Sequence, residues 1–248
     1  MDWTREEITT KLAEVKELGF VRTKRKGPTG VGFTLETLLG IQENNIHLPD
    51  LGTFELKAKR DGHTGMTTLF TFNKASWKIS PMDAIRRYGT KDKNDRLGLY
   101  QSVTTVPNNR GLRVSLDDAC IRVSSSIDQT VLLEWSLMDI SERFHEKVDN
   151  LLLVKALVDI RDGVEYFNYH QAKLLSGGPT KETLTEKIRL GDVIIDLRLH
   201  DKGTESARNH GTGFRVLEDS LEDLYGDSVE LDIRKRRDIG DIRHENRR

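Results

Sequence analysis

The chain has 248 residues, a formal net charge of −1 and 32% charged side chains. This length allows one substantial core, or one domain with two lobes, and near neutrality excludes an unstructured polycation. One cysteine excludes an internal disulfide, no clustered Cys/His spacing indicates zinc, and no apolar run approaches the roughly 20 residues that span a bilayer. We therefore expect a cytoplasmic protein without a membrane partner.

The first elements expected along the chain are two helices separated by a glycine-rich loop. Apolar residues recur at helical spacing over residues 3–18, which predicts an amphipathic helix. A basic loop follows at 22–32 and contains a run of four basic side chains without an acid. Residues 33–41 are typical of a second helix, with Thr34 as its cap and Glu36 near its beginning.

The remaining elements are a series of strands with a few helices between them. Strands are predicted at 53–59, 67–72, 112–116, 121–124 and 131–135. Residues 140–160 are expected to pass from a helix into a buried strand, and residues 180–191 form a helix that ends at Gly191, followed by a strand at 193–200. Because no regular βαβ repeat occurs, we expect an α/β or α+β fold with a mixed sheet.

The stretch 47–60, HLPDLGTFELKAKR, places two acids and a lysine close together: Asp50, Glu55 and Lys57. Strand side chains alternate between faces, so Glu55 and Lys57 point one way while their neighbours point into the core. The turn-like sequence Asp-Leu-Gly is expected to bring the carboxylate of Asp50 back beside Glu55.

Two carboxylates and a backbone carbonyl, that of Leu56, form a hard oxygen site suited to Mg²⁺. A metal there activates water and stabilises charge on phosphorus, while Lys57 holds or deprotonates the attacking water. Glu36 is a further acid expected to reach this site. The bare pattern D-x4-E-x-K is weak, and ordinary surface pairing of Glu55 with a lysine is the alternative.

The loop at 24–32 offers a phosphate contact but no nucleotide site. It lacks the GK[ST] ending of a P-loop and the GxGxxG pattern, so no nucleotide cofactor is expected. Its glycines let backbone N–H groups approach a phosphate, helped by Lys24, Arg25 and Lys26. A flexible surface turn is the alternative. The basic C-terminal segment 233–248 is explained equally well by a polyanion partner and by a solvated end.

A second group of candidate residues lies on the strand expected at 193–200, where Asp196, Arg198 and His200 share one face. Arginine suits the O6/N7 edge of guanine, and aspartate accepts from N4 of cytosine. The alternative is an Asp196–Arg198 ion pair on a solvated sheet. Further candidates for DNA contact follow nearby: Arg208, His210 and Arg215.

The ordered set of these motifs resembles the MvaI/BcnI family of type II restriction endonucleases. The family is similar to the mismatch-repair nickase MutH, within the PD-(D/E)xK nuclease superfamily. The resemblance runs from about the first helix to at least Val216, whereas the segment after about Leu231 has no counterpart. It is carried by 24-KRKGPTGVGFTLETLLG-40, 48-LPDLGTFELKAK-59, 68-TLFTF-72, 86-RRYG-89 and 209-NHGTGFRV-216.

The resemblance implies a restriction-endonuclease-like fold, with a mixed central sheet flanked by helices and two lobes around a DNA-binding cleft. We place the catalytic lobe at 1–145 and the recognition lobe at 146–248, although composition marks no boundary. The resemblance also implies that Asp50, Glu55 and Lys57 form the catalytic core.

The activity implied is that of a Mg²⁺-dependent endonuclease that acts as a monomer on a short, C/G-rich site in double-stranded DNA. It leaves 5′-phosphate and 3′-hydroxyl ends. We expect Mn²⁺ to substitute, Ca²⁺ to bind without supporting cleavage, and a cognate DNA methyltransferase in the host. Two alternatives stay open: a MutH-like nickase controlled by a repair partner, and a DNA-binding module with an inactive nuclease fold.

Overall fold

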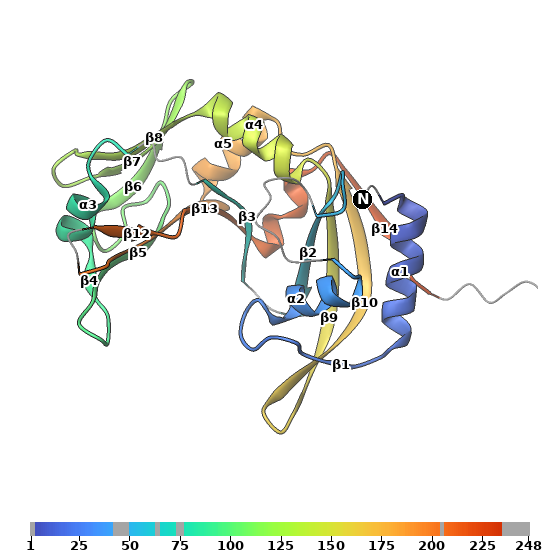
Figure 1. The fold of residues 1–248 in the computed structure, drawn as a ribbon. Helices are drawn as coiled ribbons and strands as arrows, with labels where there is room; N and C mark the ends of the chain where they lie inside the picture. The colour runs from blue at the N-terminus through green and yellow to red at the C-terminus, as the bar shows by residue number, and fades with distance from the viewer. Residues whose placement is uncertain (1–2, 42–49, 63–64, 73–76, 204–205, 235–248) are drawn as a thin grey trace, which may run out of the picture. The chain divides into compact units, whose positions relative to one another are not determined.

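The computed structural model describes residues 3–41, 50–62, 65–72, 77–203 and 206–234 (Figure 1). The chain divides into two compact units, each built from segments that are separated in the sequence. Unit 1 comprises residues 1–63, 150–175 and 228–248, and unit 2 comprises residues 64–149 and 176–227. The lobes expected from the sequence, 1–145 and 146–248, had a single boundary. The two units do not, because residues 150–175, which form two long strands, return to unit 1.

Unit 1 is a sheet covered by two helices. The strand order is β1-β10-β9-β2, with β14 paired to β10; β2 runs parallel to β9, whereas β9 and β10 form an antiparallel hairpin. The elements are α1 (Arg5–Glu17), β1 (Val21–Arg22), α2 (Gly30–Leu38), β2 (Glu55–Arg60), β9 (Leu151–Arg161), β10 (Val164–Ser176) and β14 (Asp227–Leu231).

The first helix forms as its sequence predicts. Thr4 and Glu7 make a capping box, in which the Thr4 hydroxyl accepts from the Glu7 N–H and the Glu7 carboxylate accepts from the Thr4 N–H. Ile8, Leu12 and Val15 lie on the buried side of α1 and join the core that α2 and the sheet also form. Burial of this apolar face holds α1 on unit 1.

The second helix begins earlier than predicted. α2 starts at Gly30 rather than near residue 33, and Thr34 is buried inside it instead of capping it. The Thr34 hydroxyl accepts a hydrogen bond from the Lys24 N–H at 2.9 Å. The side chain that resembled a helix cap therefore ties the preceding basic loop to the helix.

Unit 2 contains two antiparallel sheets and three helices among its described residues. One sheet has the order β3-β13-β11-β5-β4, with β12 paired to β11, and the other has the order β6-β7-β8. The elements are β3 (Met66–Phe72), α3 (Pro81–Tyr88), β4 (Thr90–Lys91), β5 (Leu97–Val103), β6 (Leu112–Leu116), β7 (Cys120–Ser125), β8 (Val131–Ser136), α4 (Leu137–Val148), α5 (Lys181–Leu190), β11 (Val193–Asp201), β12 (Ala207–Asn209), β13 (Thr212–Leu217), and the short 3-10 helices η1 (Glu218–Ser220) and η2 (Glu222–Leu224).

Aromatic side chains connect the elements of unit 2 in its core. The Phe70 ring on β3 stacks on Phe214 of β13, with centroids 5.0 Å apart, and meets Phe144 of α4 edge-on at 5.4 Å. Trp135 of β8 packs edge-on against Phe214. Each such pair adds about 0.5–1.5 kcal/mol to the area it buries. These contacts fix the sheet whose opposite face carries the polar residues described below.

Most expected elements are present with small shifts at their ends. The strand at 193–200 is β11, and α5 ends where predicted, since Gly191 takes the left-handed conformation with φ 82°. The mixed α+β fold class is confirmed. Among the described residues, no helix is both long and apolar enough to cross a bilayer.

Candidate catalytic and DNA-contacting sites

The acid–acid–lysine cluster lies on β2, at the edge of the sheet of unit 1. The Glu55 N–H donates to the carbonyl of Asn150 at 3.0 Å, and Glu55 is the register partner of Leu151 on β9. Leu56 is buried in the core, as predicted, and packs with α1 and α2. The parallel pairing with β9 therefore fixes which residues of β2 face the core and which carry the site.

A tight turn brings Asp50 back to this strand. The Leu51 N–H donates to the carbonyl of Phe54 at 2.9 Å, and Gly52 adopts φ 77°, a left-handed conformation that favours glycine. The Leu56 N–H then donates to Oδ2 of Asp50 at 3.1 Å. The structure thus places the Asp50 carboxylate against the backbone of the segment that carries Glu55.

Glu55 and Lys57 form an ion pair on one face of β2. Lys57 Nζ lies 2.5 Å from Oε1 of Glu55, whose side chain is only 3% exposed, whereas that of Lys57 is 25% exposed. A carboxylate this deeply buried is tolerated because it is charge-paired. The shared face of Glu55 and Lys57 agrees with the sequence prediction, while the near-complete burial of Glu55 distinguishes it from a solvated surface pair.

The donor set fits a hard divalent cation. Asp50, Glu55 and the Leu56 carbonyl offer oxygen atoms only, and Mg²⁺ is commonly bound by one or two carboxylates together with waters and substrate phosphates. Within the described ranges, no group of three or more His, Cys, Asp or Glu side chains gathers in a metal-binding arrangement. Any Mg²⁺ site here therefore depends on two carboxylates rather than on a full protein cage.

Glu36 lies on α2, which packs against β2. It is half-buried, and its surroundings include Tyr169 of β10, whose hydroxyl donates to the Val31 carbonyl at 2.7 Å. Burial raises the pKa of the Tyr169 phenol well above its usual range, and the negative charge of Glu36 acts in the same direction. The helix that carries Glu36 thus belongs to the same unit as the cluster on β2.

The basic loop before α2 is held in place by Arg60, at the end of β2. Arg60 donates to the carbonyls of Gly27 and Pro28, each at 3.0 Å, and binds Glu165 through two hydrogen bonds at 2.8 and 2.7 Å. The sequence did not single out Arg60, because Glu165 lies 105 residues away. Its only local signal is its place at the end of the LKAKR strand.

Close packing at Gly30 also defines the loop. A Cβ at Gly30 would lie 2.3 Å from the carbonyl oxygen of Arg25, so only glycine fits there. The Arg25 guanidinium packs 3.7 Å above the centre of the Phe33 ring, whereas Lys24 and Lys26 are exposed. The loop is therefore more than a flexible turn, and two of its three basic residues point into solvent.

The second candidate group lies on one face of the β3-β13-β11-β5 sheet of unit 2. Oδ1 of Asp196 accepts from the Ser102 hydroxyl at 2.8 Å, and its Oδ2 pairs with Arg215 at 3.2 Å. Arg198 donates to the Thr71 hydroxyl at 3.2 Å. Asp196 thus pairs with an arginine on the neighbouring strand β13, and not in the Asp196–Arg198 arrangement considered from the sequence.

His200 is nearly buried at 8% exposure, and a tyrosine lies beside it. The Tyr100 hydroxyl is 2.8 Å from Nδ1 of His200, and Nε2 of His210 is 3.4 Å from the same nitrogen. Burial lowers the pKa of His200, and so do the charges of Arg96, His210 and Arg208. Tyr100 itself is 49% exposed. The sequence analysis did not identify Tyr100 as a candidate, since nothing in its local sequence links Tyr100 to His200, 100 residues later on β11.

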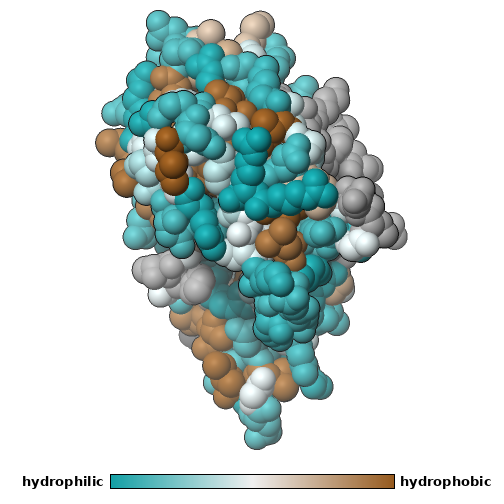
Figure 2. Space-filling model, turned by 90° about the vertical axis from the view of Figure 1, so that its left-hand side faces the viewer, coloured by the Kyte–Doolittle hydropathy of each residue, from teal (hydrophilic) through white to brown (hydrophobic). Residues whose placement is uncertain are grey.

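The two other predicted DNA contacts of this group, Arg208 and His210, are exposed at the edge formed by β12. The side of the molecule shown in Figure 2 is mostly hydrophilic, with scattered apolar side chains. Residues 235–248, most of the basic C-terminal segment, lie outside the described residues.

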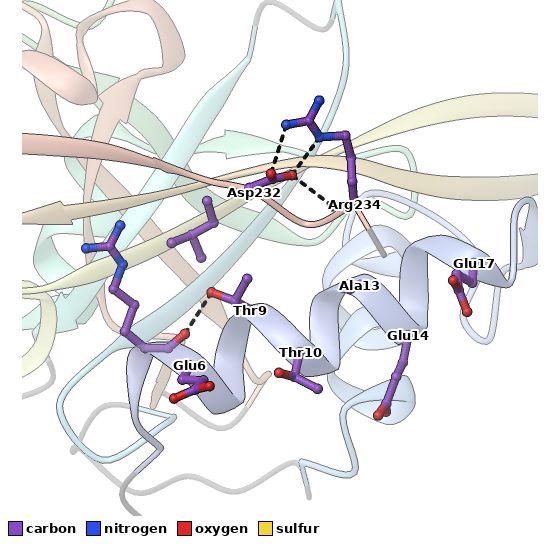
Figure 3. Close-up of a pocket in the computed structure, with 10 residues that line it drawn as sticks. Glu6, Thr9, Thr10, Ala13, Glu14, Glu17, Asp232 and Arg234 are labelled. Carbon is purple, nitrogen blue, oxygen red and sulfur yellow. Dashed lines mark hydrogen bonds and ion pairs between the residues drawn. The ribbon is translucent and has the colours of Figure 1, made fainter. Parts of the chain in front are cut away.

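A groove in unit 1 lies apart from these candidates. It runs between α1 and the residues that follow β14, and Figure 3 shows Glu6, Thr10, Glu14 and Arg234 along it. The Arg234 side chain is tied to Asp232 by hydrogen bonds at 2.7 and 2.8 Å. Of the residues lining the groove, only Arg234 belongs to a candidate binding segment singled out from the sequence, the basic segment 233–248.

Comparison with known proteins gives a consistent result. The profile of the MvaI/BcnI restriction endonuclease family matches residues 9–225. A solved complex of restriction endonuclease MvaI with a cognate DNA substrate has a TM-score of 0.77 and 25% identity, and the match covers 93% of this chain and all of that one. MvaI without DNA has a TM-score of 0.50 at the same identity, covering 93% and 99%. Among curated protein sequences, none matches.

These matches and the mixed α+β fold define a nuclease of the restriction-endonuclease type. The chain belongs to the MvaI/BcnI restriction endonuclease family. The family predicted from the ordered motifs is thereby confirmed.

Proposed function

We propose that the protein is a Mg²⁺-dependent type II restriction endonuclease that hydrolyses double-stranded DNA at a short, C/G-rich site. The observation that carries the proposal is the turn that hydrogen-bonds the Asp50 carboxylate to β2, next to the buried Glu55–Lys57 pair. Membership of a restriction endonuclease family supports the same reaction class.

In this mechanism, Asp50, Glu55 and the Leu56 carbonyl would hold Mg²⁺, which supplies Lewis-acid stabilisation of the charge that develops on the phosphate. Lys57 positions the attacking water and offsets negative charge at phosphorus. The water oxygen bonds to phosphorus in line and gives up a proton to solvent, while the bond from phosphorus to the 3′ oxygen breaks and that oxygen takes up a proton from solvent. The products are a 5′-phosphate and a 3′-hydroxyl.

Glu55 has a double role in this proposal, because it is both a metal ligand and the partner of Lys57. The buried Glu55 carboxylate holds the Lys57 amine on the same face of β2. In this proposal that amine lies beside the scissile phosphate when DNA is bound. Glu36 supports the site from α2. Mn²⁺ replaces Mg²⁺, whereas Ca²⁺ supports binding without cleavage.

Two other regions bind the duplex in this proposal. Lys24 and Lys26, on the loop that Arg60 anchors, contact backbone phosphates, which positions the duplex without reading sequence. The polar face of unit 2, with Asp196, Arg198 and Arg215, reads base edges, and Arg208 and His210 add contacts at its edge. Unit 1 is thus the catalytic unit and unit 2 the recognition unit.

The enzyme acts as a monomer, and a cognate DNA methyltransferase protects the host genome. Digestion of unmodified plasmid with Mg²⁺ and no partner protein tests this reading. Discrete double-strand fragments support it, whereas nicked circles alone would identify a nickase of the MutH type. An intact plasmid, together with unchanged metal binding in Glu55→Ala, would identify an inactive DNA-binding module.

Lys57→Ala tests the mechanism itself. We expect this variant to lose cleavage and to keep specific binding, measured by gel shift in Ca²⁺. Lys59→Ala is the matched control, since it removes the same charge two residues further along the same strand. Equal loss of binding and cleavage in Lys57→Ala would make Lys57 a structural residue.

A further inference from the structure

The polar face of unit 2 has an exposed hydrogen-bonding group that the sequence did not reveal, the phenol of Tyr100. Tyr100 on β5 is the register partner of Arg198 on β11, so the two side chains leave the sheet on the same face. Tyr100 is 49% exposed, whereas Asp196 and Arg198 on the same face are only partly exposed and His200 is buried. Tyr100 and Ser102, which is also exposed, are therefore the residues of β5 that a ligand can reach on this face.

Tyr100 reaches its neighbour because a glycine leaves room for its ring. A Cβ at Gly98 would lie 2.8 Å from Cε2 and 3.1 Å from Cδ2 of Tyr100, so the ring lies across Gly98. Gly98 is in turn the register partner of His200. Leaning over Gly98 brings the hydroxyl to 2.8 Å from Nδ1 of His200, with the two rings inclined by only 18°.

His200 determines which way this hydrogen bond points. A neutral imidazole has one N–H and one acceptor nitrogen, so Nδ1 either accepts from the phenol or donates to it. Burial lowers the pKa of His200 and so favours the neutral imidazole, and the charged groups around it are mostly cationic: Arg96, Arg208 and His210, with Asp92 as the acid. Nε2 of His210 also lies 3.4 Å from Nδ1 of His200. In the His200 tautomer that carries its proton on Nε2, the lone pair on Nδ1 accepts from the Tyr100 phenol.

In that tautomer the phenol donates its proton inward and presents only lone pairs outward. Asp196, the other acceptor of this face, is already engaged, since one of its oxygens accepts from Ser102 and the other pairs with Arg215. The Asp196 side chain is 14% exposed. Tyr100 is thus the exposed acceptor that is paired directly with Arg198, the adjacent donor.

We propose that Tyr100 is a specificity-determining residue that accepts a hydrogen bond from a base amino group, N4 of cytosine or N6 of adenine, in the major groove. His200 is the positioning residue that fixes the direction of the Tyr100 hydroxyl. A donor beside an acceptor matches a G·C pair, where guanine O6 and N7 accept and cytosine N4 donates. This inference rests on the proposed function.

The test is a double-mutant cycle, in which the Tyr100→Phe substitution is combined with DNA whose base lacks the amino group, and the two changes are compared alone and together. In duplexes that carry the mapped site, each cytosine is replaced singly by 2-pyrimidinone and each adenine by purine, and cleavage rates are measured. At one position we expect the analogue to slow the wild-type enzyme about tenfold. Tyr100→Phe should cut the natural site about tenfold more slowly and show no further loss on the analogue.

Two variants of His200 separate positioning from packing. We call the factor by which the analogue slows cleavage, relative to the natural duplex, the analogue penalty. His200→Asn keeps an acceptor near the place of Nδ1 and should retain the analogue penalty, whereas His200→Leu should lose it. Tyr88→Phe is the control, because its hydroxyl bonds to Asp128 at 3.2 Å and not to Asp196, Arg198 or His200. It should leave the penalty unchanged.

The outcomes separate this inference from the proposed function. A wild-type enzyme that cuts duplex DNA, with the same penalty in Tyr100→Phe as in wild type, overturns the inference alone. A wild-type chain that neither binds nor cuts duplex DNA overturns the proposed function and the inference with it. An analogue penalty that disappears in Tyr100→Phe and His200→Leu, and survives in His200→Asn, establishes the inference.

Discussion

Replacement of Arg60 by alanine should loosen the basic loop from β2 and lower the stability of the protein. The lost contacts are two charge-assisted hydrogen bonds to Glu165 and one to each of the carbonyls of Gly27 and Pro28. The Arg60 guanidinium also lies 5.3 Å from the centre of the Phe167 ring. No neighbouring described contact repeats this clamp between the strand and the loop.

The size of the effect follows from exposure. Hydrogen bonds to charged groups contribute about 1.5–3 kcal/mol each, but the Arg60 and Glu165 side chains are 18% and 27% exposed, so water compensates in part. Gly27 and Pro28 are exposed as well. We therefore expect the free energy of unfolding to fall by about 2–3 kcal/mol in total. Arg60→Lys should recover about half, because an ammonium lacks the planar fork.

Urea unfolding followed by circular dichroism measures this loss, and steady-state cleavage measures its functional consequence. A loosened loop should raise KM for DNA and leave kcat nearly unchanged, because the Glu55–Lys57 pair remains on β2. If Arg60→Ala unfolds at the wild-type urea concentration and keeps the wild-type KM, the clamp has no role and the reasoning is refuted.

Four further predictions follow from single contacts. Arg198→Ala should reduce discrimination among single-base variants of the site by about 1–3 kcal/mol, scored by cleavage rates. Gly213→Ala should reduce it too without altering the urea midpoint, since its Cβ would lie 3.0 Å from Nη2 of Arg198; unchanged discrimination would contradict the contact. Gly30→Ala should lower the unfolding free energy by about 1–3 kcal/mol, because the new Cβ meets the backbone. Hydrogen bonding by Arg122 lowers the pKa of Asp117 to about 2, so Asp117→Asn should lower the urea midpoint at neutral pH, with the difference vanishing as the pH falls to about 2; a difference that persists there would argue against the shift.

The proposed catalytic cluster was accessible to sequence reasoning because it is local. Asp50, Glu55 and Lys57 lie within one turn and one strand, so alternation of faces and the conformation of Gly52 are enough to bring them together. The same holds for α1, whose capping box and apolar spacing are both written within a short segment, and for α5, which ends at Gly191.

Other features depend on contacts that a linear reading does not contain. The start of α2 was misjudged because Thr34 has the chemistry of a cap, whereas its hydroxyl bonds to the loop instead. The strand β10 was not predicted, since a bulge between Tyr169 and Gln171 breaks its alternation. The Arg60–Glu165 and Tyr100–His200 contacts join residues at least 100 positions apart, and only the register of the sheets reveals them.

The parallel pairing of β2 with β9 also governs when the enzyme matures during synthesis. Translation completes the Asp50–Lys57 segment early, yet the partner strand of β2, Leu151–Arg161, leaves the ribosome almost a hundred codons later. A nascent chain of intermediate length therefore carries Asp50, Glu55 and Lys57 without the neighbouring strand that pairs with β2. If these residues cut DNA as proposed, the site is complete only after most of the polypeptide has been made.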